Sequence, residues 1–245
     1  MRAVHLHIVF LLLLSAWCNS SLAQKNRFKR YTVEDGLQNN IVFASTQDAK
    51  GLMWLATATG IDRFDGSSFS HYPLPLKDNS FTNYMQIPFL LTDSKKQVWA
   101  ASATAFYLYN LKKDLFELPA EINKQIVKGK TITSFNTGLN GSLLLVGTSN
   151  GFFIYNTETK QAILPQSYNN YVRYVFQDNT GIIWVGTNKG VARFIINGNT
   201  INELKNISAS LQPISSYAIT SISQDKSNRY WIATAGQGIF IYNEA

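Results

Sequence analysis

The chain is organised around a short segment that recurs along its length. The clearest copy spans residues 178–194 and is anchored on Trp184. The same position holds Trp54, Trp99, Leu145 and Trp231, so successive anchors are 45, 46, 39 and 47 residues apart. An aspartate precedes each tryptophan by six residues, at Asp48, Asp93, Asp178 and Asp225, whereas the Leu145 copy has Leu139 there. A period of about 40 to 50 residues restricts the chain to a repeat architecture.

Only strand signals accompany this period. Residues 182–187 and 191–196 are apolar runs, and the tripeptide Asn188-Lys189-Gly190 between them suits a hairpin loop. Similar runs precede the anchors at residues 41–47, 87–91, 132–135, 172–176 and 219–223, and weaker ones follow at 69–72, 116–118, 162–164 and 201–204. This pattern predicts an all-β fold, a β-propeller of four-stranded blades with five repeats present. The recurring tryptophans are then expected to pack between blades, because one small sheet cannot bury both of its faces.

The amino terminus has the pattern of an export signal. Arg2 precedes an apolar run at residues 8–16, which is too short to span a bilayer, and Ser21-Leu22-Ala23 suits a signal peptidase. We therefore expect a signal peptide at residues 1–23, cleavage after Ala23, and a periplasmic propeller domain at residues 24–245. No later segment has membrane-spanning length, and cleavage would remove Cys18, the only cysteine.

Composition narrows the function classes. The chain has a formal net charge of +7, but an exported protein rarely meets nucleic acid, so we expect no nucleic-acid partner. The basic residues Lys25, Arg27, Lys29 and Arg30 suit the exposed side of an edge strand, with attraction to acidic glycans as the alternative. After cleavage His71 is the only histidine, which argues against metal sites and serine–histidine triads. We expect no cofactor, no metal and no enzymatic activity. The less favoured alternative is a glycan-active enzyme using Glu34, Asp35 or Glu121.

Two copies, at residues 48–65 and 178–194, share the pattern Asp-x-x-Gly-x-x-Trp, in which one apolar residue, a small residue and a threonine follow the tryptophan. With the segment at residues 28–37, they resemble the repeat of two-component regulator propellers. The resemblance implies the periplasmic sensor region of a Bacteroidetes hybrid two-component system, which usually contains seven-bladed propellers followed by a membrane helix and a kinase. With five copies and no kinase, this chain resembles the amino-terminal piece of such a receptor. The resemblance further implies an oligosaccharide ligand, with self-association or downstream receptor domains as partners.

Alternating strand direction predicts which face binds ligand. The hairpins between second and third strands, and the long connections between blades, should share one face, where variable loops usually bind. The candidate ligand residues on that face are Asn39, Asn40, Tyr84, Tyr171, Asn188, Tyr217 and Gln237. A turn or packing role is the alternative for each of them. For the whole chain, the alternative is a protein-interaction scaffold or a truncated gene product.

The ends of the chain raise the question of closure. Residues 28–31 repeat the Phe-x-x-Tyr pattern of the outer strand at residues 69–72, and the fifth unit has only three strands. The amino-terminal strand can therefore complete a closed ring of five blades. The resemblance to a seven-bladed family favours an open arc instead, with bare apolar faces on its first and fifth blades.

Overall fold

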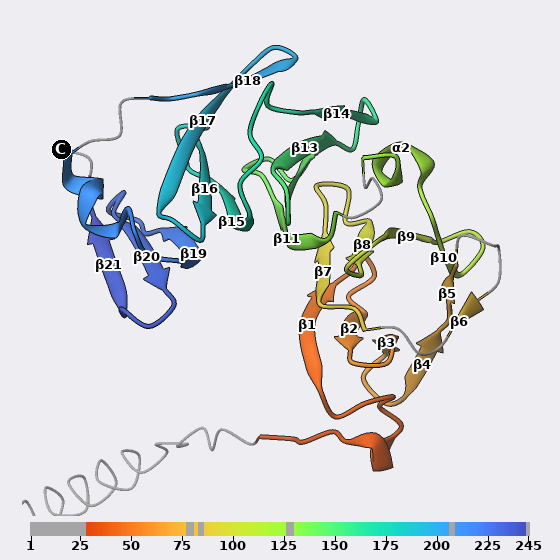
Figure 1. The fold of residues 1–245 in the computed structure, drawn as a ribbon. Helices are drawn as coiled ribbons and strands as arrows, with labels where there is room; N and C mark the ends of the chain where they lie inside the picture. Colours follow the sequence, from red (N-terminus) through yellow and green to blue (C-terminus); the bar gives the residue numbers. More distant parts are fainter. Residues whose placement is uncertain (1–27, 77–80, 83–85, 126–129, 206–208, 244–245) are drawn as a thin grey trace, which may run out of the picture. The chain divides into compact units, whose positions relative to one another are not determined.

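The structure is a computed structural model that describes residues 28–76, 81–82, 86–125, 130–205 and 209–243. The chain divides into two units, Met1–Tyr31 and Thr32–Ala245, and the described strands all belong to the second unit. Figure 1 shows this second unit as a succession of small sheets. The expected signal peptide at residues 1–23 lies outside the described residues, as does Tyr84.

Five antiparallel sheets form the blades, which confirms the predicted all-β propeller fold. Blade 1 contains β1 (Val42–Gln47), β2 (Met53–Thr57), β3 (Ile61–Phe64) and β4 (Phe69–Tyr72). Blade 2 contains β7 (Phe89–Thr92), β8 (Val98–Ala101), β9 (Phe106–Asn110) and β10 (Leu115–Glu117). Blade 3 contains β11 (Ile132–Thr137), β12 (Leu143–Thr148), β13 (Phe152–Asn156) and β14 (Gln161–Ile163). Blade 4 contains β15 (Val172–Gln177), β16 (Ile183–Thr187), β17 (Val191–Asn197) and β18 (Thr200–Glu203). Blade 5 contains β19 (Ile219–Gln224), β20 (Tyr230–Thr234) and β21 (Ile239–Tyr242).

Short elements occupy several connections. The 3-10 helix η1 (Val33–Asp35) precedes β1, and β5 (Leu74–Pro75) pairs with β6 (Phe81–Thr82) between blades 1 and 2. The helix α2 (Ala120–Asn123) follows β10, and the 3-10 helix η2 (Ala209–Ile214) precedes β19. The first strands of the blades, β1, β7, β11, β15 and β19, lie side by side in that order.

The predicted strand at residues 28–31 is wrong, because these residues adopt no regular secondary structure. A strand exists through hydrogen bonds to a neighbouring strand, and a sequence pattern shared with β4 does not supply that neighbour. Among the described residues, the sheet of blade 5 has only three strands and nothing pairs with the free edge of β21. Among the described residues, no strand at residues 28–31 is therefore available to complete the sheet of blade 5.

Each gap between consecutive blades is filled by one apolar cluster. At the first interface, Trp54 of blade 1 lies 4.5 Å from Tyr109 of blade 2, measured between ring centroids. At the fourth, Trp184 of blade 4 lies 4.2 Å from Tyr230 of blade 5. The described residues thus form four interfaces for five blades, whereas a closed ring of five would need a fifth interface.

The two end faces of this row differ. On blade 5 the apolar side chains Ile239 and Ile241 are 63% and 54% exposed, as expected for a bare end face. On blade 1 the segment before β1 covers part of the face: Leu37 is buried there, and the backbone N–H of Gln38 donates to the buried carboxylate of Asp62 at 2.8 Å. The expectation of bare faces on both end blades thus holds fully only for blade 5.

A hydrogen bond between each turn aspartate and its tryptophan recurs in four blades. One carboxylate oxygen accepts two backbone N–H groups of the turn between the first and second strands. The other accepts the indole N–H of the tryptophan six residues later. The indole nitrogen to carboxylate distances are 2.8 Å for Trp54 to Asp48, 3.1 Å for Trp99 to Asp93, 2.7 Å for Trp184 to Asp178 and 2.9 Å for Trp231 to Asp225. The constant six-residue spacing is the sequence signal of this bond.

The degenerate third copy keeps the turn without the carboxylate. The N–H of Gly138 donates to the carbonyl of Leu143 at 2.8 Å, as Asp48 does to Leu52 in blade 1. Gly138 rather than Leu139 therefore occupies the aspartate position, because this turn is one residue longer. A Cβ on Gly138 would lie 2.5 Å from Oε1 of Gln177, the side chain from blade 4 that fills this space.

Tryptophan burial predicts how stability depends on the blade. Trp54, Trp99 and Trp184 are 0%, 3% and 0% exposed, whereas Trp231 is only partly buried, because among the described residues no blade packs on the far side of blade 5. Replacing Trp184 with alanine should lower the free energy of unfolding by about 3–5 kcal/mol, the usual cost of truncating a buried large aromatic side chain. Trp231→Ala should cost clearly less. Urea denaturation of both variants checks this, and equal losses would contradict the burial argument.

The hydrogen bonds of Asp178 predict an acid sensitivity. Burial alone would raise the pKa of this carboxyl, but hydrogen bonds from Thr180, Trp184 and Tyr230 hold the pKa below its usual value of 3.8. A group whose pKa is lowered by folding stabilises the folded state above its unfolded pKa of about 3.9, and this stabilisation is lost as pH falls through the folded pKa. The melting temperature of the chain should therefore decrease when the pH is lowered beyond about 4.

The variant Asp178→Asn isolates this contribution. It should melt at a lower temperature near neutral pH, and its melting temperature should fall less steeply below about pH 4 than that of the unmodified chain. Thermal denaturation followed by circular dichroism at a series of pH values makes the comparison. Identical acid slopes for the two proteins would show that Asp178 does not contribute.

Candidate ligand-binding site

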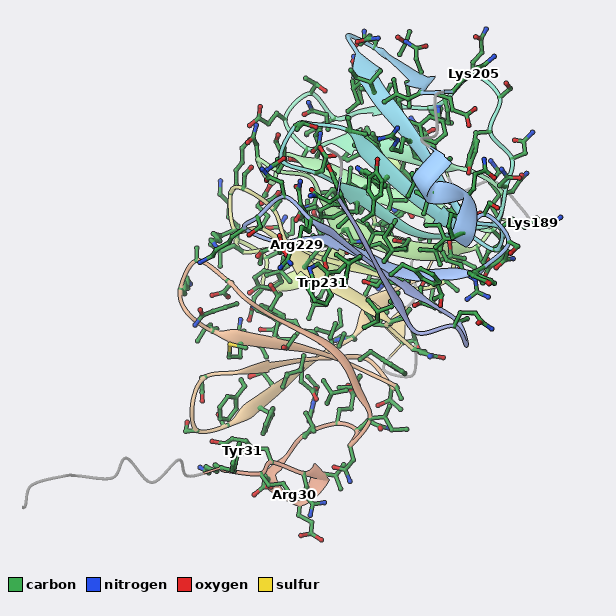
Figure 2. The ribbon with its side chains drawn as sticks, turned by 90° about the vertical axis from the view of Figure 1, so that its left-hand side faces the viewer. Arg30, Tyr31, Lys189, Lys205, Arg229 and Trp231 are labelled. Carbon is green, nitrogen blue, oxygen red and sulfur yellow. The ribbon has the colours of Figure 1, made fainter. Side chains whose placement is uncertain are left out.

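A cavity of about 450 Å3 opens on the face that sequence reasoning assigned to ligand binding. It lies between the β14–β15 connection, the β16–β17 hairpin and β18. Its lining residues are Tyr168, Asn170, Tyr171, Thr187, Asn188, Lys189, Val191, Ala192 and Glu203. The candidate ligand residues Tyr171 and Asn188 are thus brought together, although 17 residues (188 − 171) separate them in the chain. In Figure 2 the side chain of Lys189 extends outward from the β16–β17 hairpin.

Arg173 on β15 connects the two candidate residues. Its Nε donates to Oδ1 of Asn188 at 2.5 Å, and its guanidinium carbon lies 6.0 Å from the ring centroid of Tyr171. The Tyr171 side chain is 42% exposed, so part of its ring remains open to a ligand. Sequence reasoning missed Arg173, because an arginine in an apolar strand run gives no signal of what it faces.

The wall made by the β14–β15 connection is packed closely against blade 3. The N–H of Gly151 donates to the carbonyl of Asn170 at 2.8 Å, and a Cβ on Gly151 would lie 2.3 Å from the carbonyl oxygen of Tyr168. Gly151 also has φ +89, so this hairpin position requires glycine for two reasons. The Tyr168 ring packs edge-on against Phe152 and Phe194, and burial raises the pKa of its hydroxyl.

The β16–β17 hairpin is anchored to the next blade. The hydroxyl of Thr187 donates to the carbonyl of Gly190 at 3.0 Å, and the N–H of Gly190 donates to the carbonyl of Tyr217 at 2.8 Å. Gly190 has φ +75 and approaches the backbone of Ser215 so closely that a Cβ would lie 2.8 Å from its Cα. Both walls of the cavity are therefore held by backbone hydrogen bonds, and the site is preformed rather than assembled from free loops.

The other candidate ligand residues that the structure describes lie outside this cavity. Oδ1 of Asn39 accepts the N–H of Ile41 at 2.8 Å, and Oδ1 of Asn40 accepts the N–H of Val33 at 3.0 Å, so both side chains hold the turn before β1. Tyr217 stacks on Phe240 in the fourth apolar cluster, with ring centroids 5.9 Å apart. Gln237 is exposed in the β20–β21 hairpin, apart from the cavity.

The carboxylates considered for catalysis are not paired with one another. Asp35 accepts hydrogen bonds from the backbone N–H and the hydroxyl of Thr32, which caps η1. Glu34 is exposed in the same helix, and Glu121 is exposed in α2. In the described part of the chain, no three histidine, cysteine, aspartate or glutamate side chains come close enough together to hold a metal ion. The described residues also contain no helix long and apolar enough to cross a bilayer.

The fold and the repeats together define a β-propeller, and two of its repeats match a known propeller family. The family described as "Two component regulator propeller" matches residues 169–189 and 213–236, which contain all of β15, β16, β19 and β20. The resemblance proposed from the sequence is thereby confirmed for the fourth and fifth repeats. No curated protein matches the chain.

Solved structures share the fold. One is an extracellular domain assigned to the hybrid two-component system BT4673 of B. thetaiotaomicron, with 22% identity and a TM-score of 0.61 over 84% of this chain and 27% of that one. Virginiamycin B lyase from Staphylococcus aureus is 16% identical, with a TM-score of 0.54 over 82% of this chain and 69% of that one. PorZ, a surface component of the type-IX secretion system of Porphyromonas gingivalis, is 14% identical, with a TM-score of 0.57 over 82% of this chain and 32% of that one.

These similarities bear on fold rather than activity. The chain spans about a quarter of the length of the BT4673 domain. The similar structures include both a receptor's extracellular domain and a lyase, and one fold hosts many functions. The function of this chain therefore has to be argued from its own cavity.

Proposed function

We propose that the chain is the ligand-sensing part of a periplasmic receptor and that it binds an oligosaccharide in the cavity between Tyr171 and Asn188. The observation that carries this proposal is the composition of the cavity. An exposed tyrosine ring, the amides of Asn170 and Asn188, and the charged groups of Lys189 and Glu203 line one preformed space. Ligand sites typically combine an apolar surface with a few polar groups that fix orientation.

The chemistry of a sugar suits this lining. The C–H face of a sugar ring can pack on the exposed part of the Tyr171 ring, because an aromatic side chain offers a flat apolar surface. Its hydroxyl groups both donate and accept hydrogen bonds, as the amide groups of Asn170 and Asn188 also do. Glu203 accepts hydrogen bonds and Lys189 donates them. A volume of about 450 Å3 lies within the range of sites for small ligands.

The location of the cavity suggests how binding is communicated. Its walls belong to blade 4 and to the β14–β15 connection that leads into it, and the β16–β17 hairpin is tied through Gly190 to the connection that leads into blade 5. A ligand that orders these loops would change the surface offered to a second copy or to further receptor domains. We propose such contacts as the output, with no chemical reaction at this site.

Binding measurements on paired variants test the proposal. Isothermal titration calorimetry of the purified chain against a panel of neutral oligosaccharides should reveal a binder. Tyr171→Ala and Asn188→Ala should each weaken its affinity by about tenfold or more, equivalent to about 1.4 kcal/mol. The matched control is Gln237→Ala, which alters an exposed amide in the corresponding hairpin of blade 5 and should leave affinity unchanged.

The outcomes separate the alternatives. An oligosaccharide that binds equally to the Tyr171→Ala, Asn188→Ala and unmodified chains would contradict the location of the site. No binding by any member of the panel would contradict the ligand class. Chromatography of the bound sugar after prolonged incubation should show it intact, and shortened products would show that the chain is an enzyme.

A further inference from the structure

A second cavity, of about 390 Å3, opens on the face opposite the candidate oligosaccharide site. It lies where the β1–β2 turn of blade 1 meets the β7–β8 and β9–β10 turns of blade 2. Val98, Leu108 and Tyr109 form its inner apolar surface. Val98 and Tyr109 are buried, at 1% and 8% exposure, so the floor is fixed by the first blade interface.

The floor is also held by hydrogen bonds. The hydroxyl of Tyr109 donates to the carboxylate of Asp114, which accepts the hydroxyl of Tyr72 at 2.8 Å and Nη1 of Arg63 at 2.9 Å. Asp114 is thereby shared between blades 1 and 2. A cavity whose floor is fixed in this way does not need to close around a ligand before binding it.

The rim of this cavity carries an excess of positive charge. Lys50, Lys95, Lys96 and Lys112 line it, all four are exposed, and none forms an ion pair with any carboxylate in the described residues. The two acidic side chains in the wall are already engaged. Asp48 accepts hydrogen bonds from its own turn and from Trp54, and Glu117 pairs with Lys113 at 2.8 Å.

The backbone of Lys96 points to a role beyond the turn. Lys96 has φ +57, in the left-handed region that favours glycine. The equivalent turn positions of blades 1 and 4 are Gly51 and Gly181, with φ of 81 and 92, and that of blade 5 is Asn228, with φ of 61. The turn would therefore form more readily with glycine than with lysine, and strained positions of this kind concentrate at functional sites.

We propose that this cavity binds a small organic anion that carries two or more acid groups on an apolar body. The apolar body would rest on Val98, Leu108 and Tyr109, and the acid groups would meet the lysine ammonium groups of the rim. Lysine acts as a flexible point charge with three donors, so the site would accept acid groups without demanding a planar, two-point geometry. This site is independent of the proposed oligosaccharide site, because the two cavities share no residue.

Fluorescence anisotropy with hydroxypyrene trisulfonate, an apolar ring system with three acid groups, tests the proposal on the full chain. The dye should bind, and raising the salt concentration from about 50 to about 300 mM should weaken binding several-fold, because exposed charges are screened. The double variant Lys95→Gln/Lys96→Gln should weaken binding by about tenfold or more. The control Lys205→Gln/Lys226→Gln removes the same charge from exposed lysines outside the cavity and should change affinity less than about twofold.

The single variant Lys96→Gly separates a binding role from a structural one. It removes one charge and relieves the left-handed backbone, so it should weaken dye binding while leaving the melting temperature equal or higher. If the melting temperature and the affinity for the dye both decreased, the assignment of Lys96 to a ligand site would be overturned.

Competition completes the test. Displacement of the dye by benzene hexacarboxylate, which carries carboxylates in place of sulfonates, would support a site that recognises acid groups in general. Three results would overturn the proposal: equal weakening by the two double variants, binding that does not respond to salt, or displacement by uncharged hydroxypyrene at the same concentration.

Discussion

In four of the five blades, the hydrogen bond from the tryptophan indole to the aspartate of its own turn is the interaction that connects the turn to the packing of the blades. In blade 4, Asp178 is fully buried and accepts bonds from Trp184 at 2.7 Å and from Tyr230 of the next blade at 2.8 Å. A buried carboxylate is tolerable only when its acceptor sites are filled, and here the turn backbone and two aromatic side chains fill them. The bond also fixes the indole where the next sheet will cover it, which links the turn to the packing of blades.

This packing explains why the blades differ in exposure and where cavities form. A blade buries its tryptophan only when another blade follows, so Trp184 is fully buried while Trp231, whose turn has the same hydrogen bonds, is only partly covered. In Figure 2 Trp231 lies beside Arg229, whose guanidinium carbon is 5.9 Å from the indole centroid. Where two blades meet, their turns cannot fill the rim completely, and the two cavities lie at such junctions on opposite faces.

The repeat pattern predicted the blades closely, because apolar periodicity and hairpin residues act locally. β4 begins and ends where the sequence placed it, and β18 is displaced by one residue.

Other features could not be predicted from the sequence. Residues 28–31 form no strand, because a sequence pattern does not supply the neighbouring strand to which a strand must hydrogen-bond. Strand direction placed Tyr171 and Asn188 on one face, but the link through Arg173 depends on packing. The lysine-lined cavity was missed because Lys50 and Lys96 belong to different repeats and meet only when the blades stack.

The most direct test of this account is a double-mutant cycle on the central bond. Asp178→Asn and Trp184→Phe are made singly and together, and the free energy of unfolding of all four proteins is measured in urea. If the indole and the carboxylate act as a unit, the losses of unfolding free energy in the two single variants should add up to more than the loss in the double variant. The difference, which is the coupling energy, should be about 1 kcal/mol or more. Losses that add within about 0.5 kcal/mol would show that the two side chains stabilise the fold independently and would contradict the account.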